Sequence, residues 1–252
     1  LLIDNGSSGV PDAPSLPPFA RLLHCAEAGS YAARNVGIAQ ARAPVLAFTD
    51  ADCEPEPDWL ARALACLAER DAETLLAGAI AVMPRDPRAP NRWERYDMVM
   101  GLRQRHFVRR GYAATANLLV ARALAQRLGG FDAARYSGGD ADFCRRALLA
   151  GSSLHYCEGV VVRHPARDDW RQLAGKVRRI KGGQLRAGGM RRRAWYVFRS
   201  FVPPLWLWSY ILRSRGLTVG QRLQVCGVQA LLWLVEMAEA LRLLAGGAPR
   251  RS

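Results

Sequence analysis

The chain has 252 residues, half of them hydrophobic, and a formal net charge of +14. This length allows one ordinary domain with an appendage, and the apolar half can build a sizeable core, which excludes a disordered chain. The six cysteines lie far apart, with no Cys-x-x-Cys pair and no secretory segment ahead of them, so we expect free thiols in a reducing cytosol.

The positive charge is almost entirely local. Residues 163–215 hold fourteen Arg and Lys against Asp168 and Asp169, a balance of +12, whereas residues 1–162 hold eighteen residues of each sign. A neutral body therefore carries a basic, aromatic-rich C-terminal third. This distribution weakens the inference of nucleic-acid binding that the net charge alone suggests.

The first part of the chain alternates short apolar runs with helical patterns. Asp4, Asn5 and Gly6 mark the turn that ends the first strand. The pattern predicts strands over 1–3, 20–25, 45–49 and 74–82, a helix over 31–42 capped by Ser30, and a helix over 58–70. Such alternation predicts an α/β fold with a mostly parallel sheet flanked by helices, in which ligands bind at the carboxyl ends of strands.

The later part continues the same alternation. Residues 84–110 are interrupted by proline and then read as helical, and a strand is expected over 113–121. A helix that ends at Gly129 and Gly130 follows. A further helix ends at Gly151, and the run LHYCEGVVVRHP predicts a strand that leads into His164.

Asp50 and Asp52 directly follow the strand over 45–49. Side chains two residues apart on an extended chain point the same way, so both carboxylates can face one hard cation, Mg²⁺ or Mn²⁺. The alternative is structural, because acidic residues also favour the N-terminus of the helix that follows. On the motif alone the structural interpretation is the stronger one.

A second acidic cluster, Asp140 and Asp142, begins the helix after Gly138 and Gly139. Helix capping explains one of these carboxylates. The functional hypothesis is that Asp140 projects into a cleft and acts as a general base toward an incoming hydroxyl. A neutral imidazole at His164 could complete a metal site, although a lone histidine beside proline is more often a hydrogen-bonded loop residue.

The C-terminal segment combines arginine with tryptophan and tyrosine around Pro203 and Pro204. Such aromatic residues favour membrane interfaces, and arginines favour anionic headgroups. Residues 223–247 are long enough to span a bilayer, but Glu236 and Glu239 make a span costly, so we expect an amphipathic helix in the membrane plane with one narrow wet face. A helical cap packed on the first domain is the alternative.

Taken together, these pieces resemble the GT-A type, family 2 glycosyltransferases over roughly residues 1–185. The resemblance rests on the following segments in this order: IDNGSS (3–8), GSYAARNVGIAQARAPVLAFTDADCEPEPDWL (29–60), TANLLVAR (115–122), GGFD (129–132), SGGDADFCRR (137–146) and VVVRHP (160–165). It implies a GT-A domain over 1–190 and a basic helical, membrane-associating extension over 191–252.

The resemblance also implies roles for individual residues. Asp140 would be the catalytic base, Asp52 would ligate Mg²⁺ or Mn²⁺, and His164 would contact the metal or diphosphate. The implied donor contacts are Asp4 at the base, Arg34 and Asn35 at the nucleotide end, and Asp50 at the sugar or ribose. The implied acceptor or diphosphate side consists of Asn117, Asp142, Gln184 and Arg186.

The implied function is inverting transfer of a sugar from a nucleoside-diphosphate donor to a hydroxyl of a lipid-linked or cell-envelope glycan, at the inner face of the cell membrane. The family's domain begins with another strand and loop that this sequence lacks, so we expect the chain to be a fragment. A sugar nucleotidyltransferase and a non-catalytic module that binds nucleic acid or membrane remain alternatives; no nucleic acid is implied as a partner.

Overall fold

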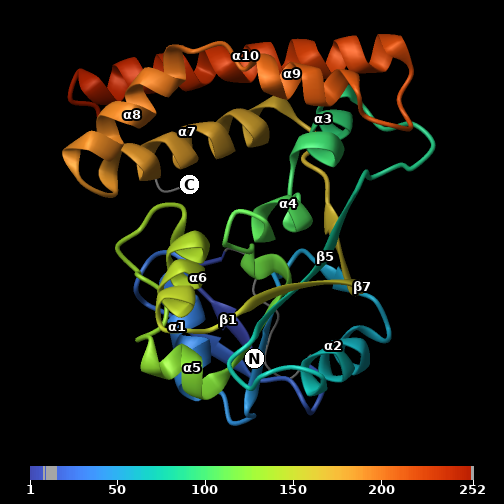
Figure 1. Cartoon of the computed structure of the whole chain (residues 1–252), viewed down its shortest axis with the longest axis vertical. Helices are drawn as coiled ribbons and strands as arrows, with labels where there is room; N and C mark the ends of the chain where they lie inside the picture. The colour runs from blue at the N-terminus through green and yellow to red at the C-terminus, as the bar shows by residue number, and fades with distance from the viewer. Residues whose placement is uncertain (8, 10–15, 251–252) are drawn as a thin grey trace. The chain divides into compact units, whose positions relative to one another are not determined.

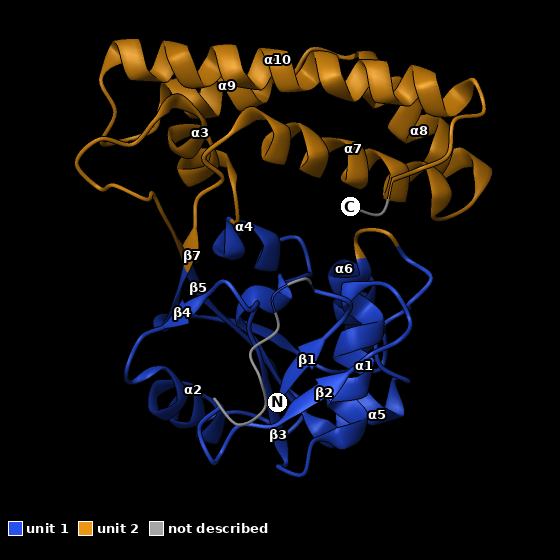
Figure 2. Ribbon diagram, turned by 180° about the vertical axis from the view of Figure 1, so that it is seen from behind, with its two compact units in different colours: residues 1–80, 103–135, 139–163 blue, residues 81–102, 136–138, 164–252 orange. Residues whose placement is uncertain are grey.

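The computed structural model describes residues 1–7, 9 and 16–250. Ser8, the last residue of the IDNGSS segment, lies outside them. The described chain divides into two compact units, coloured separately in Figure 2: residues 1–80, 103–135 and 139–163 form the first, and residues 81–102, 136–138 and 164–252 the second. These units do not follow the expected ranges 1–190 and 191–252.

The strands form two sheets. β1 (Leu2–Asp4) and β2 (Leu22–His24) pair in parallel as a small sheet. The larger sheet has the order β3-β6-β5-β7-β4, with bounds β3 Val45–Phe48, β4 Glu54–Pro55, β5 Leu75–Met83, β6 Leu118–Ala121 and β7 Leu154–Pro165. Figure 1 shows these strands with helices beside them. The expected α/β fold with flanking helices is therefore confirmed.

The expectation of a mostly parallel sheet is wrong. β6 runs antiparallel to both β3 and β5, and β4 runs antiparallel to β7. Because the chain leaves β5 through two helices before it enters β6, it returns to the sheet from the end at which it left. The predicted strand over 113–121 is also too long, since Thr115–Asn117 forms a 3-10 turn and the strand begins at Leu118.

The helices of the first unit are α1 (Ser30–Gln40), α2 (Trp59–Ala68), α4 (Gln104–Val108), α5 (Arg122–Arg127) and α6 (Gly139–Leu149). Their apolar faces cover the larger sheet. One core cluster joins Leu75 and Leu118 of the sheet to Phe143 of α6, and a second joins Trp59 of α2 to Val160 of β7. The buried strand residues explain why short apolar runs form this sheet.

The second unit is helical. Its elements are α3 (Arg92–Met100), α7 (Trp170–Arg186), α8 (Met190–Phe201), α9 (Leu205–Leu212) and α10 (Val219–Leu244). Leu173 of α7 packs with Val228 and Leu232 of α10, and Trp93 of α3 packs against this cluster. α10 is the one helix in the described chain that is long and apolar enough to cross a membrane, and a third of its apolar window is buried in the protein.

Candidate functional site

The turn after β1 is held by side chains that the sequence places there. The backbone N–H of Ser7 donates to Oδ1 of Asp4 at 2.9 Å, and Nδ1 of His24 lies 3.3 Å from Oδ2. The Ser7 N–H, followed by His24, lowers the pKa of Asp4 below its usual value, so this carboxylate is ionised at neutral pH.

Asn5 was predicted only as a turn residue, but it connects this turn to the start of α1. Its Nδ2 donates to the carbonyl oxygens of Cys25 and Glu27, and its Oδ1 accepts from the N–H of Gly29 at 2.6 Å. Asn5 therefore positions the neighbouring Asp4 carboxylate at the carboxyl end of β1. The long sequence separation of its partners is the reason that the sequence offered no signal for this role.

Arg34 and Asp50 come from adjacent elements, α1 and the loop after β3. Nη2 of Arg34 lies 2.8 Å from Oδ1 of Asp50, and both side chains are partly buried. The guanidinium of Arg34 therefore places a positive charge beside the acidic loop. The two residues that were expected at the donor are thus brought together.

Asn35 has a different set of contacts. Its Nδ2 donates to the carbonyl of Phe131 at 2.8 Å, and its Oδ1 accepts from the Phe131 N–H at 2.7 Å. Gly130 precedes Phe131 with φ +69°, and a Cβ there would collide with Oδ1 of Asn35. Both sides of the amide therefore bind the GGFD turn, which gives Asn35 a structural task beside the expected donor contact.

Asp50, Asp52 and Cys53 form a compact group after β3. Each offers a possible ligand atom within 4.8 Å of the others. Burial, the largest effect, raises the pKa of the Cys53 thiol to about 11, so this sulfur is protonated at neutral pH. The donors that remain are carboxylate oxygens, which suit Mg²⁺ or Mn²⁺.

His164 is buried, and its Nδ1 lies 2.7 Å from the carbonyl oxygen of Pro165. A carbonyl accepts but does not donate, so this contact is a hydrogen bond when Nδ1 carries the hydrogen. The backbone of the preceding residue is fixed by the sheet, because Arg163 is the register partner of Glu54. In that tautomer Nε2 is the ring nitrogen that could ligate a metal.

Asp140 lies in the first turn of α6, and one of its oxygens is anchored. Oδ2 accepts from the N–H and the hydroxyl of Thr115 at 3.2 and 3.3 Å. Oδ1 is buried and has no hydrogen-bond partner in the described part of the chain. A carboxylate with one oxygen held and the other unsatisfied suits a proton acceptor, because the unsatisfied oxygen gains most from a donor.

Tyr31 also positions Asp140, although the sequence gave no sign of it. The hydroxyl of Tyr31 accepts from the N–H of Gly139 at 2.9 Å, and the Tyr31 ring occupies the space that a side chain at residue 139 would need. The residue before Asp140 must therefore be glycine. This contact joins α1 to the first turn of α6.

Asp142 is bound on both sides by arginine. Oδ1 lies 2.7 Å from Nη2 of Arg135, and Oδ2 lies 2.9 Å from Nε of Arg146. Arg146 also donates to the carbonyl oxygens of Leu128 and Gly130. This network connects α6 to the turn after α5, so Asp142 has a structural task, which differs from the helix capping expected for one member of the acidic pair.

Asn117 ends the 3-10 turn before β6, and its side chain is completely buried. Its Nδ2 donates to the carbonyls of Ala79 and Val160, and its Oδ1 accepts from Nε1 of Trp59 at 3.0 Å. Both amide hydrogens are used within the protein, so the side chain has none to offer a diphosphate or an acceptor sugar.

The two remaining candidates belong to the second unit. Nη1 of Arg186, at the end of α7, donates to the hydroxyl of Tyr136 at 2.8 Å, and its guanidinium lies over the Tyr136 ring at 4.7 Å. Oε1 of Gln184 is buried without a hydrogen-bond partner among the described residues. Gln184 therefore has an unused acceptor, whereas Arg186 is already engaged.

Three comparisons show which known proteins this chain is similar to. The model of the family described as Glycosyl transferase family 2 matches residues 1–128. Glycosyltransferase AglE of Haloferax volcanii is 30% identical over 255 residues, which cover 95% of this chain and 82% of AglE. The pre-mycofactocin glycosyltransferase of Mycobacterium tuberculosis is 29% identical over 59% of this chain and 33% of its own length.

Among solved structures, the chain is similar to a mannosyltransferase from Pyrobaculum calidifontis in complex with GDP-Man and Mn²⁺. The TM-score is 0.51 with 17% identity, and the match covers 89% of this chain and 69% of the mannosyltransferase. At this identity the similarity supports a shared fold.

Proposed function

Since the chain belongs to glycosyltransferase family 2, we propose that it transfers a sugar from a nucleoside-diphosphate donor to a hydroxyl acceptor with inversion of the anomeric carbon. The observation that carries the proposal is the group formed by Asp50 and Asp52 after β3, with Arg34 ion-paired to Asp50. Carboxylates at a strand end beside a fixed guanidinium suit a donor that holds both a cation and a diphosphate.

In this proposal, the acidic group and the residues around it hold the donor. Asp52 and His164 would ligate Mg²⁺ or Mn²⁺, with Asp50 toward the sugar or ribose and Arg34 at the nucleotide end. A cation bound there supplies positive charge to the diphosphate oxygens. The related mannosyltransferase was solved with Mn²⁺, which supports this choice of metal.

Asp140 is the proposed base. As the acceptor oxygen forms its bond to the anomeric carbon, the bond from that carbon to the diphosphate oxygen breaks, and the hydroxyl proton passes to Oδ1 of Asp140. The nucleoside diphosphate leaves with the electron pair. Thr115 keeps Oδ2 fixed during this step, because its N–H and hydroxyl already hold that oxygen in the protein alone.

The other candidates carry different weight. Asp4 stays the proposed contact to the nucleotide base, and Gln184 stays a proposed acceptor-side residue. We leave Asn117 out of the proposal because its amide hydrogens are used inside the sheet, and we assign Asp142 and Asn35 mainly to structure. The proposed acceptor is a hydroxyl of a lipid-linked or cell-envelope glycan, and the proposed location is the cytoplasmic surface of the membrane.

A panel of nucleotide sugars tests the proposal in two ways, by thermal shift and by release of nucleoside diphosphate, each with and without Mn²⁺. We expect one donor to raise the melting temperature only when the cation is present. Asp52→Ala should remove that shift, while Asp58→Ala, which changes an exposed carboxylate on the same loop-helix segment, should keep it. Release of pyrophosphate, or the absence of a shift with every donor, would contradict the proposal.

A further inference from the structure

The two faces of α10 have the opposite polarity from that of a helix on a water-facing surface. The narrow polar stripe that was expected to be wet consists of positions 222, 229 and 236, yet Gln229 is buried. Gln229 accepts from the hydroxyl of Tyr96 on α3 at 2.8 Å, and Glu236 lies 2.7 Å from Nζ of Lys181 on α7. Positions 229 and 236 of this stripe therefore make their polar contacts within the second unit, although the Glu236 side chain stays 32% exposed.

The opposite face of α10 is apolar and exposed. Its outward side chains are Val219, Leu223, Leu231, Leu234, Leu241 and Leu244. At 100° per residue these positions share one side of the helix, whereas the buried Val225, Val228 and Leu232 lie on the other. A helix that buries its glutamine and glutamate and exposes its leucines is built for an apolar environment on its outer side.

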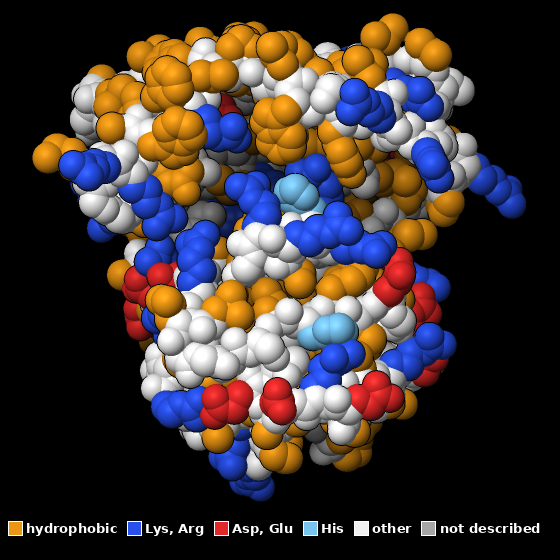
Figure 3. Space-filling view, viewed as in Figure 1, with side chains coloured by type: hydrophobic (Ala, Val, Ile, Leu, Met, Phe, Trp, Pro, Cys, Tyr) orange, Lys and Arg blue, Asp and Glu red, His pale blue; other side chains and the backbone are white. Residues whose placement is uncertain are grey.

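Helices α8 and α9 extend this surface. Trp195 and Phe198 of α8 are exposed, with their rings in a tilted contact at 5.9 Å between centroids, and Leu205 and Trp206 of α9 are exposed as well. Figure 3 shows hydrophobic side chains gathered over these helices and α10. α8 is attached to α10 by a hydrogen bond from Nε1 of Trp233 to the carbonyl of Ser200. The exposed residues therefore belong to one joined set of helices.

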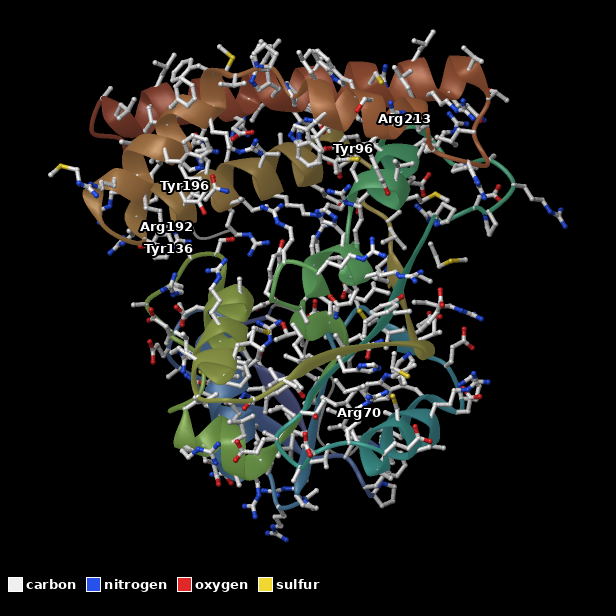
Figure 4. All side chains as sticks on the ribbon, in the orientation of Figure 1. Arg70, Tyr96, Tyr136, Arg192, Tyr196 and Arg213 are labelled. Carbon is white, nitrogen blue, oxygen red and sulfur yellow. The ribbon has the colours of Figure 1, made fainter. Side chains whose placement is uncertain are left out.

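The same helices carry an almost purely positive charge. Residues 187–250 contain nine arginines and two acidic residues, Glu236 and Glu239. Both glutamates are ion-paired, Glu236 with Lys181 and Glu239 with Arg242. Arg192 and Arg213, which Figure 4 labels, are exposed on α8 and at the end of α9. The free charge of this surface is thus carried by arginine.

A cavity of about 420 Å³ opens between α7, α10 and the last described residues of the chain, and the ion-paired Glu239 and Arg242 are part of its lining. Leu231, Leu234 and Ala238 form part of its apolar lining, and Arg178 and Arg250 also border it. An apolar hollow beside guanidinium groups matches a molecule with a hydrocarbon chain and a phosphate. Arginine binds phosphate through several donors at once, which gives such a site preference over a neutral headgroup.

We propose that the outer face of α8, α9 and α10 docks on an anionic phospholipid bilayer, with the helices in the membrane plane. Leucine and tryptophan enter the interface, and the arginines bind lipid phosphates. The polar stripe of α10 excludes a span for this helix as it is packed here, because its partners on α3 and α7 occupy the other side. Docking does not depend on sugar transfer, so the two can fail separately.

The test is sedimentation of the 252-residue chain with vesicles of phosphatidylcholine alone or with about a third phosphatidylglycerol, at low salt. We expect binding to the anionic vesicles, weakened at least tenfold by Leu234→Asp and by Trp195→Asp. Leu64→Asp is the matched control, since Leu64 and Leu234 are each 53% exposed and Leu64 lies on α2 of the first unit. Circular dichroism confirms that each variant is folded.

Charge is tested separately. Replacing Arg191, Arg192 and Arg193 by glutamine should weaken binding to anionic vesicles at least tenfold, whereas the same change at the exposed Arg21, Arg42 and Arg145 of the first unit should not. Equal effects of the two triple variants would overturn the proposal. A lack of vesicle binding would also overturn it. The same holds if the protein self-associates instead and Leu234→Asp abolishes that self-association, or if bound protein resists extraction with alkaline carbonate.

Discussion

Nη2 of Arg34 on α1 and Oδ1 of Asp50 after β3 form an ion pair at 2.8 Å between two elements that both border the proposed donor site. The pair fixes the acidic loop against α1 with a charge that pH does not remove. Because Asp50 also belongs to the group of possible metal ligands, the arginine balances part of the negative charge that this group concentrates.

Arg34→Ala should therefore weaken donor binding. Removal of one partner of a partly buried, charged hydrogen bond costs about 1.4 kcal/mol, which corresponds to a tenfold rise in Kd or KM for the donor. Titration calorimetry with the donor that the nucleotide-sugar panel identifies measures this change in Kd. Arg62→Ala is the control, because Arg62 pairs with Asp58 in the same unit and both side chains are exposed. A similar loss of donor affinity in both variants would show that the effect comes from the net charge of the protein and not from the contact between Arg34 and Asp50.

Asp140→Asn should abolish transfer, with at least a thousandfold fall in kcat, and leave donor affinity unchanged. The amide oxygen can still accept from Thr115, so the geometry is kept, but the side chain no longer takes a proton at neutral pH. Single-turnover kinetics measures the chemical step. Retained activity in this variant would remove the assignment of the base.

Asp142→Asn should show the opposite pattern. It loses the charge that holds Arg135 and Arg146, so we expect a fall in melting temperature of several degrees, with kcat per folded molecule largely kept. Thermal unfolding and active-site titration separate the two effects. A full loss of kcat with an unchanged melting temperature would show that Asp142 acts on the substrate.

Lys181 and Glu236 should be coupled in stability. Lys181 is 2% exposed, so Glu236→Gln leaves a buried ammonium without its counter-charge, and a loss of about 3 kcal/mol is expected. The double variant Lys181→Met and Glu236→Leu should recover most of that loss, because neither charge is then buried alone. Urea unfolding of the single and double variants gives the coupling free energy between Lys181 and Glu236. If the losses of unfolding free energy in the single variants add up in the double variant, the two residues are not coupled.

Lys176 should make stability depend on pH. Burial, partly offset by Asp97, lowers the pKa of Lys176 from 10.5 to about 8. Between pH 8 and 10.5 the unfolded chain holds this proton more tightly than the folded chain, so the contribution of Lys176 to stability rises with pH, by up to about 1.4 kcal/mol per unit. Comparison with Lys176→Met isolates the effect, and parallel curves for the two proteins would contradict it.

Much of this protein could be predicted from local sequence patterns. The alternating strands and helices, the acidic loop after β3 and the helix that begins near Asp140 were each placed within a few residues, because side-chain periodicity and helix ends depend on neighbours a few positions away. The family resemblance added the order of these segments, and the family comparisons confirm the family itself.

Tertiary structure decided what depends on distant partners. Asn35 binds Phe131, 96 residues later, and Asn117 joins Trp59 to Val160, so no local pattern could separate them from donor contacts. The direction of β6 and the inward face of α10 were decided in the same way. A sequence states which residues share a side of a helix, but only packing determines whether that side meets water, protein or, as we propose, lipid.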